Sequence, residues 1–200
     1  MASIVVAGDT SGSVTIAAPA VAGSSTLTLP TGTGTFSVNG ASTNIVLGTS
    51  QATTSGTSFT FTGIPSWARR VTVLFNGVSL SGTDNFLVQI GSGSVTTSGY
   101  NSSTGYAGAS TGNTSPAIST SGFVFQDGSA SNVMYGRMVI ELFSGSTYVQ
   151  THTGGSVQGA TAYFNGGGGY VALGGAMDRV KIAATGSNTF TAGSVNITYE

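Results

Sequence analysis

Apolar and polar residues alternate along most of this chain, in short runs that Gly, Ser, Thr and Pro separate. From residue 57 onward the alternating runs lie at 59–61, 71–75, 86–90, 123–125, 138–143, 148–152, 179–182 and 195–199. A period of two is typical of strands that bury one face. No stretch has the spacing of an amphipathic helix, and at most residues 65–68 form one tight turn. The pattern predicts an all-β protein whose main domain, residues 56–200, is a jelly-roll-like antiparallel β-sandwich.

Three segments between these runs carry turn or loop patterns. Asn76-Gly77 stands between two apolar runs and predicts a hairpin turn, because both turn positions need a positive φ. Residues 91–121 are mostly Gly, Ser and Thr, so we expect long loops there, with at most one short strand. The four consecutive glycines at 166–169 predict a loop that packs closely against another backbone.

The first 55 residues differ from the rest of the chain. Phe36 is the only aromatic residue before Phe59, and Asp9 is the only charged residue before Arg69. Short alternating runs lie at 14–16, 27–29, 36–38 and 45–47. So few apolar residues cannot form a core alone, because even a complete two-stranded hairpin is marginal in water. We therefore expect residues 1–55 to be an extended, β-rich N-terminal arm that other chains stabilise. A flexible linker is the alternative.

The charge content narrows the classes of function. Charged residues make up 6% of the chain, against about 25% in an average soluble domain. The net charge is −1 and only five residues are basic, so a nucleic-acid-binding surface is not expected. A hydrophobic content of 39% also separates the chain from disordered proteins. A surface with so few charges is poorly soluble when it is free, which favours a subunit that is largely covered by partners.

Cysteine usage and hydropathy argue against disulfides, membrane spans and a signal peptide. The chain has no Cys, so disulfides and thiolate metal sites are absent. No run reaches the roughly 18 apolar residues of a membrane span, and membrane insertion is not expected. The first residues contain no Lys or Arg and no long apolar core, so no secretory signal peptide is expected either.

Catalytic patterns are weak throughout the chain. Residues 108–112 match G-x-S-x-G, but no strand-to-helix context surrounds them, and His152 is the only His. The internal acids are Asp9, Asp84, Asp127, Glu141 and Asp178, which are scattered singly. Glycoside hydrolysis needs two carboxylates across a cleft. We therefore expect no enzyme, no cofactor and no metal site. A polysaccharide-degrading enzyme and an oxygen-ligand calcium site remain as alternatives.

Five aromatic residues are candidates for ligand binding: Trp67, Tyr100, Tyr106, Tyr163 and Tyr170. The four Tyr fall in segments expected to be loops, and exposed Tyr is enriched in recognition surfaces. Trp67 precedes Ala68 and the two basic residues Arg69 and Arg70, which fits a sugar-stacking or subunit-contact group. The alternative is that Trp67 caps the core and that the Tyr side chains pack as ordinary anchors.

Three blocks of the chain resemble fibre-like proteins of tailed bacteriophages. The first block is GDTSGSVTI at 8–16, followed by the stretches 18–23 and 26–30. The second is FTGIP at 61–65, followed by 71–79 and 87–91. The third consists of 178–182 and 190–200. The resemblance covers about half of the chain. It implies a β-rich module, often trimeric, that sits on a phage tail or head and contacts the host surface. No catalytic residues come with it.

These observations together predict a virion structural protein of the tail-fibre type that contributes to host attachment. We expect a homotrimer, with the arm contacting other virion proteins and the outer loops contacting a host cell-surface glycan. Such a protein would be made in the host cytoplasm without a signal peptide and then reside in the phage particle. The alternative is a capsid decoration protein, either a head fibre or a cement protein.

Overall fold

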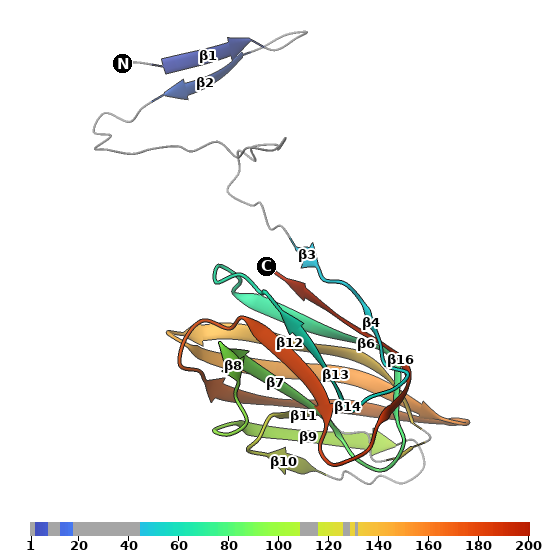
Figure 1. Ribbon diagram of the computed structural model, residues 1–200. Coiled ribbons are helices and arrows are strands. Elements are labelled where there is room, and N and C mark those ends of the chain that lie inside the picture. Colours follow the sequence, from blue (N-terminus) through green and yellow to red (C-terminus); the bar gives the residue numbers. More distant parts are fainter. Residues whose placement is uncertain (1–2, 8–12, 18–44, 109–115, 126–128, 131) are drawn as a thin grey trace. The chain divides into compact units, whose positions relative to one another are not determined.

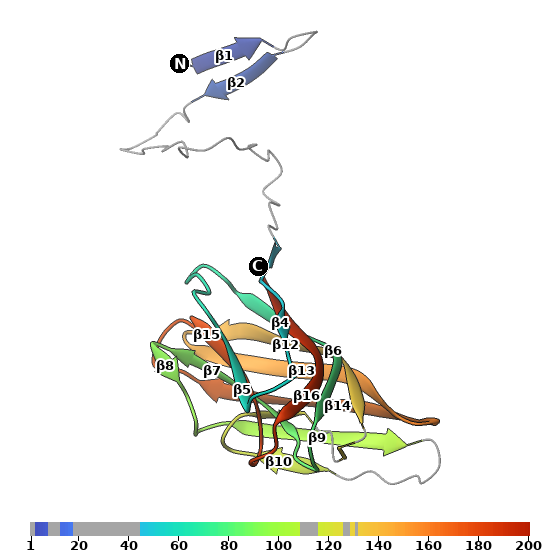
Figure 2. The ribbon, with the colours of Figure 1, turned by 45° about the vertical axis from the view of Figure 1, so that its right-hand side comes forward.

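A computed structural model describes residues 3–7, 13–17, 45–108, 116–125, 129–130 and 132–200 (Figure 1). The chain divides into two compact units, Met1–Ser42 and Thr43–Glu200. In the first unit, β1 (Ser3–Ala7) pairs antiparallel with β2 (Ser13–Ala17). The alternating runs predicted at 27–29 and 36–38 lie outside the described residues. The second unit is a two-layered antiparallel β-sandwich, as predicted (Figures 1 and 2).

The sandwich consists of a large sheet and a small sheet. The large sheet contains β3 (Val46–Leu47), β4 (Gln51–Ala52), β6 (Arg70–Leu80), β9 (Asn101–Gly108), β10 (Ala117–Ser119), β12 (Val133–Ser144), β13 (Thr147–Gln158), β14 (Thr161–Ala172) and β16 (Phe190–Tyr199). Its order is β10-β9-β14-β13-β12-β6-β16-β3, and β4 also pairs with β16. The small sheet contains β5 (Ser58–Thr62), β7 (Phe86–Ser92), β8 (Ser94–Val95), β11 (Phe123–Phe125) and β15 (Arg179–Ala184). Its order is β11-β7-β15-β5, with β8 beside β7.

The strand pairing is that of a jelly roll with two insertions. If β3 and β4 count as one interrupted first strand, the first strand pairs with the last (β16), β5 with β15, β6 with β12 and β7 with β11. This nested pairing is one long hairpin rolled into two sheets. The inserted strands β9 and β10, and the inserted pair β13 and β14, widen the large sheet. The sequence-based prediction of a jelly-roll-like sandwich is therefore confirmed.

The core lies between the two sheets and is built from the inward positions of the alternating runs. The largest fully buried apolar side chains are Phe86, Phe123, Phe125, Phe190, Tyr148, Leu80, Ile90, Met134, Met138, Ile140 and Ile182. Phe75 links the layers, since its ring lies 5.3 Å from that of Phe125 and 5.8 Å from that of Phe86, centroid to centroid. Burial of one such side chain contributes about 1.5–3 kcal/mol.

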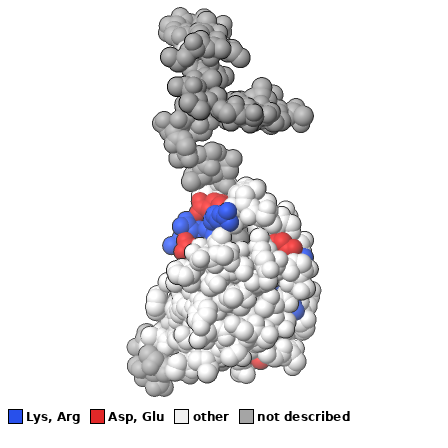
Figure 3. Space-filling view, turned by 90° about the vertical axis from the view of Figure 1, so that its left-hand side faces the viewer, with Lys and Arg blue, Asp and Glu red and all other residues white. Residues whose placement is uncertain are grey.

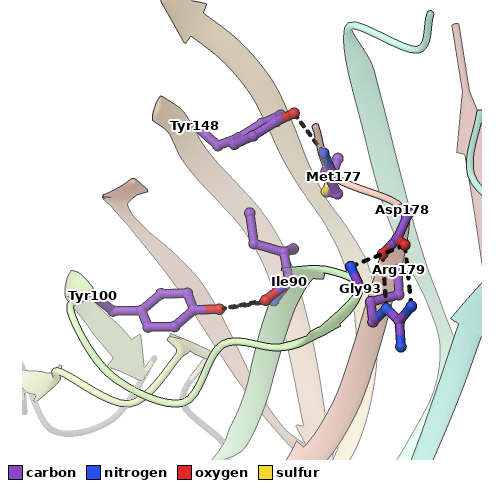
Figure 4. A network of polar contacts seen from close by, with 7 residues as sticks. All are labelled: Ile90, Gly93, Tyr100, Tyr148, Met177, Asp178 and Arg179. Atoms are coloured by element: carbon purple, nitrogen blue, oxygen red, sulfur yellow. Dashed lines mark hydrogen bonds and ion pairs between the residues drawn. The ribbon is translucent and has the colours of Figure 1, made fainter. Parts of the chain in front are cut away.

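Two tyrosine hydroxyls join the sheets through hydrogen bonds to backbone atoms (Figure 4). Tyr148 on β13 accepts the Met177 N–H at 2.8 Å, just before β15. Tyr100 accepts the Ile90 N–H of β7 at 2.8 Å. In the same view, Asp178 accepts the Gly93 N–H at 3.0 Å and pairs with Arg179. Each of these bonds gives a backbone N–H a side-chain oxygen as its partner.

The predicted hairpin at Asn76-Gly77 is wrong. The strand β6 runs straight through both residues, and Gly77 adopts a φ of 67°. The β6–β12 register shifts there, because Val78 pairs with Met134 and Asn76 with Tyr135. Gly77 is thus the extra residue of a β-bulge, a role that needs the same positive φ as a hairpin turn.

The loops predicted at 91–121 and 166–169 are also largely wrong. The first segment contains β8, β9 and β10, while residues 109–115 lie outside the part that the structure describes. The four glycines lie inside β14, between β13 and β9. Their close approach to a neighbouring backbone is real, since a Cβ on Gly167 would lie 2.2 Å from the Ser103 carbonyl oxygen. The short strands β3 and β4, which the sequence placed in the arm, pair with β16 in the sandwich.

Candidate functional site

The large sheet overhangs the small one. Each of β12, β13 and β14 has 12 residues, whereas β7, the longest strand of the small sheet, has 7. At about 3.3 Å per residue, the long strands extend well past the layer that covers them. Figures 1 and 2 show the joined ends of β13 and β14 projecting beyond the other strands. The inward face of this overhang is therefore not covered by the small sheet.

Inward-facing residues become polar toward the overhang. Along β13 the buried series runs from Tyr148 through Gln150 and His152 to Ser156. The paired positions on β14 run from Val171 to Asn165. This strand face is thus apolar at Tyr148 and Val171 and polar from Gln150 to Ser156.

A pocket of about 150 Å³ lies on this polar face. Its lining residues are Tyr106, Ser129, Asn132, Ser156, Gln158, Tyr163 and Asn165. Tyr106 comes from β9 and Tyr163 from β14, and their rings meet edge to face with centroids 5.6 Å apart. The described lining residues include no Lys, Arg, His, Asp or Glu, and each of them carries an amide or a hydroxyl group.

Hydrogen bonds hold one wall of this pocket in place. Gln158 donates from Nε2 to the Ser129 hydroxyl at 2.9 Å, and the Tyr163 hydroxyl donates to Gln158 Oε1 at 3.4 Å. Asn165 is 1% exposed, yet its Nδ2 makes only long contacts, 3.5 Å to Ser156 Oγ and 3.7 Å to Met134 Sδ. Contacts of that length are weak, so this buried amide retains unused hydrogen-bonding capacity.

The five predicted ligand-binding residues do not form one site. Tyr106 and Tyr163 meet in the pocket, and with Tyr170 they lie in strands rather than in the predicted loops. Tyr170 is 51% exposed on the opposite face of β14. Trp67 is 53% exposed in the tight turn at 65–68, 5.7 Å from the Tyr199 ring. Sequence inspection did not single out Ser156, Gln158 and Asn165, because Ser, Gln and Asn are usual on exposed strand faces and no local motif marks these three.

Tyr100 lies in the core rather than in a recognition loop. It is 3% exposed, and its ring packs edge to face on Phe123 at 5.0 Å. Its hydroxyl lies 3.2 Å from the Ile90 carbonyl oxygen and 3.1 Å from that of Thr96. Burial raises the pKa of this phenol to about 12. Tyr100 therefore acts as a packing anchor, the alternative considered for the Tyr side chains.

The outward face of the large sheet is the second notable surface. Among the described residues, eight of the nine large hydrophobic side chains that are exposed lie on or beside this outer face: Ile45, Leu47, Ile118, Tyr135, Phe143, Val157, Phe164 and Tyr170. The ninth is Trp67. A hollow of about 600 Å³ lies on the same face between β6, β12 and β16.

The charged residues that line this hollow are Arg70, Arg137, Glu141 and Glu200. Arg70 donates to Glu141 at 2.6 Å and also pairs with Glu200. Hydrogen bonds to these two carboxylates raise the pKa of Arg70 above its ordinary value. Figure 3 shows charged side chains clustered at one end of the face in view, while most of that face is uncharged.

The single histidine belongs to the interior. His152 Nδ1 lies 2.7 Å from Gln150 Nε2, its Nε2 lies 2.9 Å from the Thr104 hydroxyl, and its ring packs on Phe125. Burial lowers the pKa of this imidazole to about 4. It is therefore neutral at physiological pH and embedded in a polar network.

Three of the acidic side chains make hydrogen bonds or ion pairs with nearby residues. Asp84 accepts the Asn188 N–H at 2.9 Å, Asp178 pairs with Arg179, and Glu141 pairs with Arg70. Within the described part of the chain, no three His, Cys, Asp or Glu side chains group as a metal site would require. Asp9, Asp127 and most of the G-x-S-x-G match at 108–112 lie outside the described residues.

Comparison with known protein families, curated proteins and solved structures finds no match to this chain. In the residues that the structure describes, no helix is long and apolar enough to cross a membrane. The function of the chain is therefore inferred from its own residues and their arrangement.

Proposed function

We propose that this chain is a structural subunit of a bacteriophage particle, of the tail-fibre type, that contributes to attachment to the host surface. The observation that carries the proposal is the outer face of the large sheet, which combines exposed large hydrophobic side chains with few charges. The three fibre-like blocks, which begin at residues 8, 61 and 178, add the phage context. The role is assembly and adhesion rather than catalysis.

The outer face favours a subunit that other chains cover. Phe143 is 74% exposed and Phe164 is 61% exposed. Burial of such a side chain contributes about 1.5–3 kcal/mol, and free monomers rarely expose large apolar patches. A homotrimer is the assembly that we propose, with the N-terminal arm contributing contacts to other virion proteins.

Multivalency connects this assembly to adhesion. Several copies on one particle turn weak individual contacts with a host glycan into strong overall binding. A rigid sandwich is a suitable carrier for such contacts, because it presents each binding surface in a fixed orientation.

The direct test is to quantify the protein in purified phage particles by mass spectrometry against labelled peptide standards. We expect tens of copies per particle, in the tail fraction after heads and tails are separated. Hundreds of copies in the head fraction would instead indicate a capsid decoration protein. Absence from the particles would contradict both roles. Release of reducing sugar from host polysaccharide by the purified chain would indicate the polysaccharide-degrading alternative.

A further inference from the structure

We propose that the pocket lined by Tyr106 and Tyr163 is a subsite for one neutral sugar ring of a host surface polysaccharide. This inference rests on the proposed role in host attachment and names the chemistry through which that role would operate. It assigns a specific place on the fold to recognition: the polar overhang of the large sheet, and not the outer face.

The size of the pocket sets the size of the ligand. A volume of about 150 Å³ exceeds what a single water molecule requires. It is also smaller than the roughly 300–1,000 Å³ of sites for drug-sized molecules. One sugar ring, with the rest of its chain outside, matches this volume.

The lining chemistry selects a neutral polyhydroxylated ligand. None of the described side chains that line the pocket is charged, so none of them compensates a phosphate, a sulfate or a sugar carboxylate. The amides of Gln158 and Asn165 and the hydroxyl of Ser156 supply donors and acceptors together. Sugar hydroxyls need both at once, and the two tyrosine rings offer surfaces for the apolar face of the ring.

The weak hydrogen bonding of the Asn165 side chain is a second, independent observation that points to a ligand. Its side chain lies on a central strand at 1% exposure and lines the pocket, but its Nδ2 has only the two long contacts, to Ser156 and Met134. Buried amides are normally well hydrogen-bonded, and a poorly satisfied one calls for an explanation. A ligand hydroxyl in the pocket would complete its hydrogen bonding.

The test is saturation-transfer NMR on the full-length chain with a panel of monosaccharides. Glucose, galactose and N-acetylglucosamine are the neutral probes, and N-acetylneuraminic acid is the charged probe. At roughly −0.3 kcal/mol per heavy atom, a ligand of about twelve heavy atoms binds with a dissociation constant of a few millimolar, which this method detects. We expect transfer to at least one neutral sugar and none to the charged one.

A pair of variants on one strand locates the site. We expect Tyr163→Ala to weaken binding by about tenfold or more, and Tyr170→Ala, on the opposite face of β14, to leave it unchanged. Gln158→Ala, a milder change at a half-buried residue, should weaken binding and lower the melting temperature only slightly, because it removes one hydrogen bond to Ser129 and a long one from Tyr163. This variant keeps the test informative if Tyr163→Ala unfolds.

Three results would overturn the proposal: no transfer to any neutral sugar, preferential transfer to N-acetylneuraminic acid, or loss of binding in Tyr170→Ala with retention in Tyr163→Ala. These failures are distinct from failure of the proposed function. If the chain is present in particles but binds no monosaccharide, only the subsite proposal is wrong. If the chain binds sugar but is absent from particles, the proposed virion role is wrong.

Discussion

At the scale of single residues, a buried histidine makes the stability of this protein depend on pH. Burial keeps the pKa of His152 near 4 in the folded state, against an ordinary value of 6.5. Between these values the unfolded chain binds a proton that the folded chain does not. The free energy of unfolding therefore falls as pH drops from about 6.5 to about 4, by at most about 3 kcal/mol.

The measurement is thermal unfolding at pH 7 and pH 5 for the wild type and for His152→Gln. We expect the wild type to lose more stability between the two pH values than the variant, which lacks this titrating group. The carboxylates contribute equally in both proteins, so the difference isolates the imidazole. Equal losses would mean that His152 is accessible to protons in the folded state.

The glycines of β14 provide a second prediction at this scale. A Cβ on Gly167 would lie 2.2 Å from the Ser103 carbonyl oxygen and 2.6 Å from His152 Cε1. Gly167→Ala should therefore destabilise the fold by about 1–3 kcal/mol, the usual range for overpacking. Gly166→Ala is the matched control, because the atoms nearest to its added Cβ lie 3.4 Å away or farther. Urea unfolding midpoints should separate the two variants, and equal midpoints would contradict the close approach.

At the scale of elements, the first strand of the jelly roll lies in a segment that composition assigns to the arm. Gly48 donates its N–H to the Ile197 carbonyl, and Thr53 donates its N–H to that of Gly193 at 2.9 Å. The Thr53 hydroxyl also donates to the Ala192 carbonyl at 2.6 Å. The segment 46–53 thus covers an edge of β16 that would otherwise expose unpaired backbone groups.

Two truncations test this assignment. Removal of residues 1–42 should leave the melting temperature of the sandwich unchanged, because those residues form a separate compact unit. Removal of residues 1–55 should lower it, by about 2–4 °C for each kcal/mol lost, because β3 and β4 leave β16. If both truncations melt alike, the pairing with β16 contributes nothing to stability.

At the scale of the whole molecule, the outer face of the large sheet predicts association. We expect multi-angle light scattering to find a trimer for the full chain. The double variant Phe143→Ser/Phe164→Ser should shift it toward monomer, because burial of those rings stabilises the contact. Trp67→Ser is the matched control, since among the described residues Trp67 is the one large exposed hydrophobic that lies off this face. A monomeric wild type, or an equal shift in the control, would contradict assembly through the outer face.

Local patterns in the sequence determined the strands and the class of fold. Val180 and Ile182 are buried between the more exposed Arg179 and Lys181, as their alternation predicts. The residues 65–68 form the expected turn, with the Ala68 N–H bonded to the Pro65 carbonyl at 2.9 Å. Alternation predicts such features because successive side chains of any strand point to opposite faces.

Only the tertiary structure decided which strands meet and what each ambiguous residue does. A positive φ at Gly77 suits a hairpin turn or a bulge, and the register with β12 selects the bulge. The glycines at 166–169 form a strand because β9 and β13 lie against both sides of it. Tyr106 and Tyr163 are far apart in the chain and share a pocket only because β9 pairs with β14. Pairing between distant strands depends on the packing of the whole sandwich, and a local pattern of residues does not encode it.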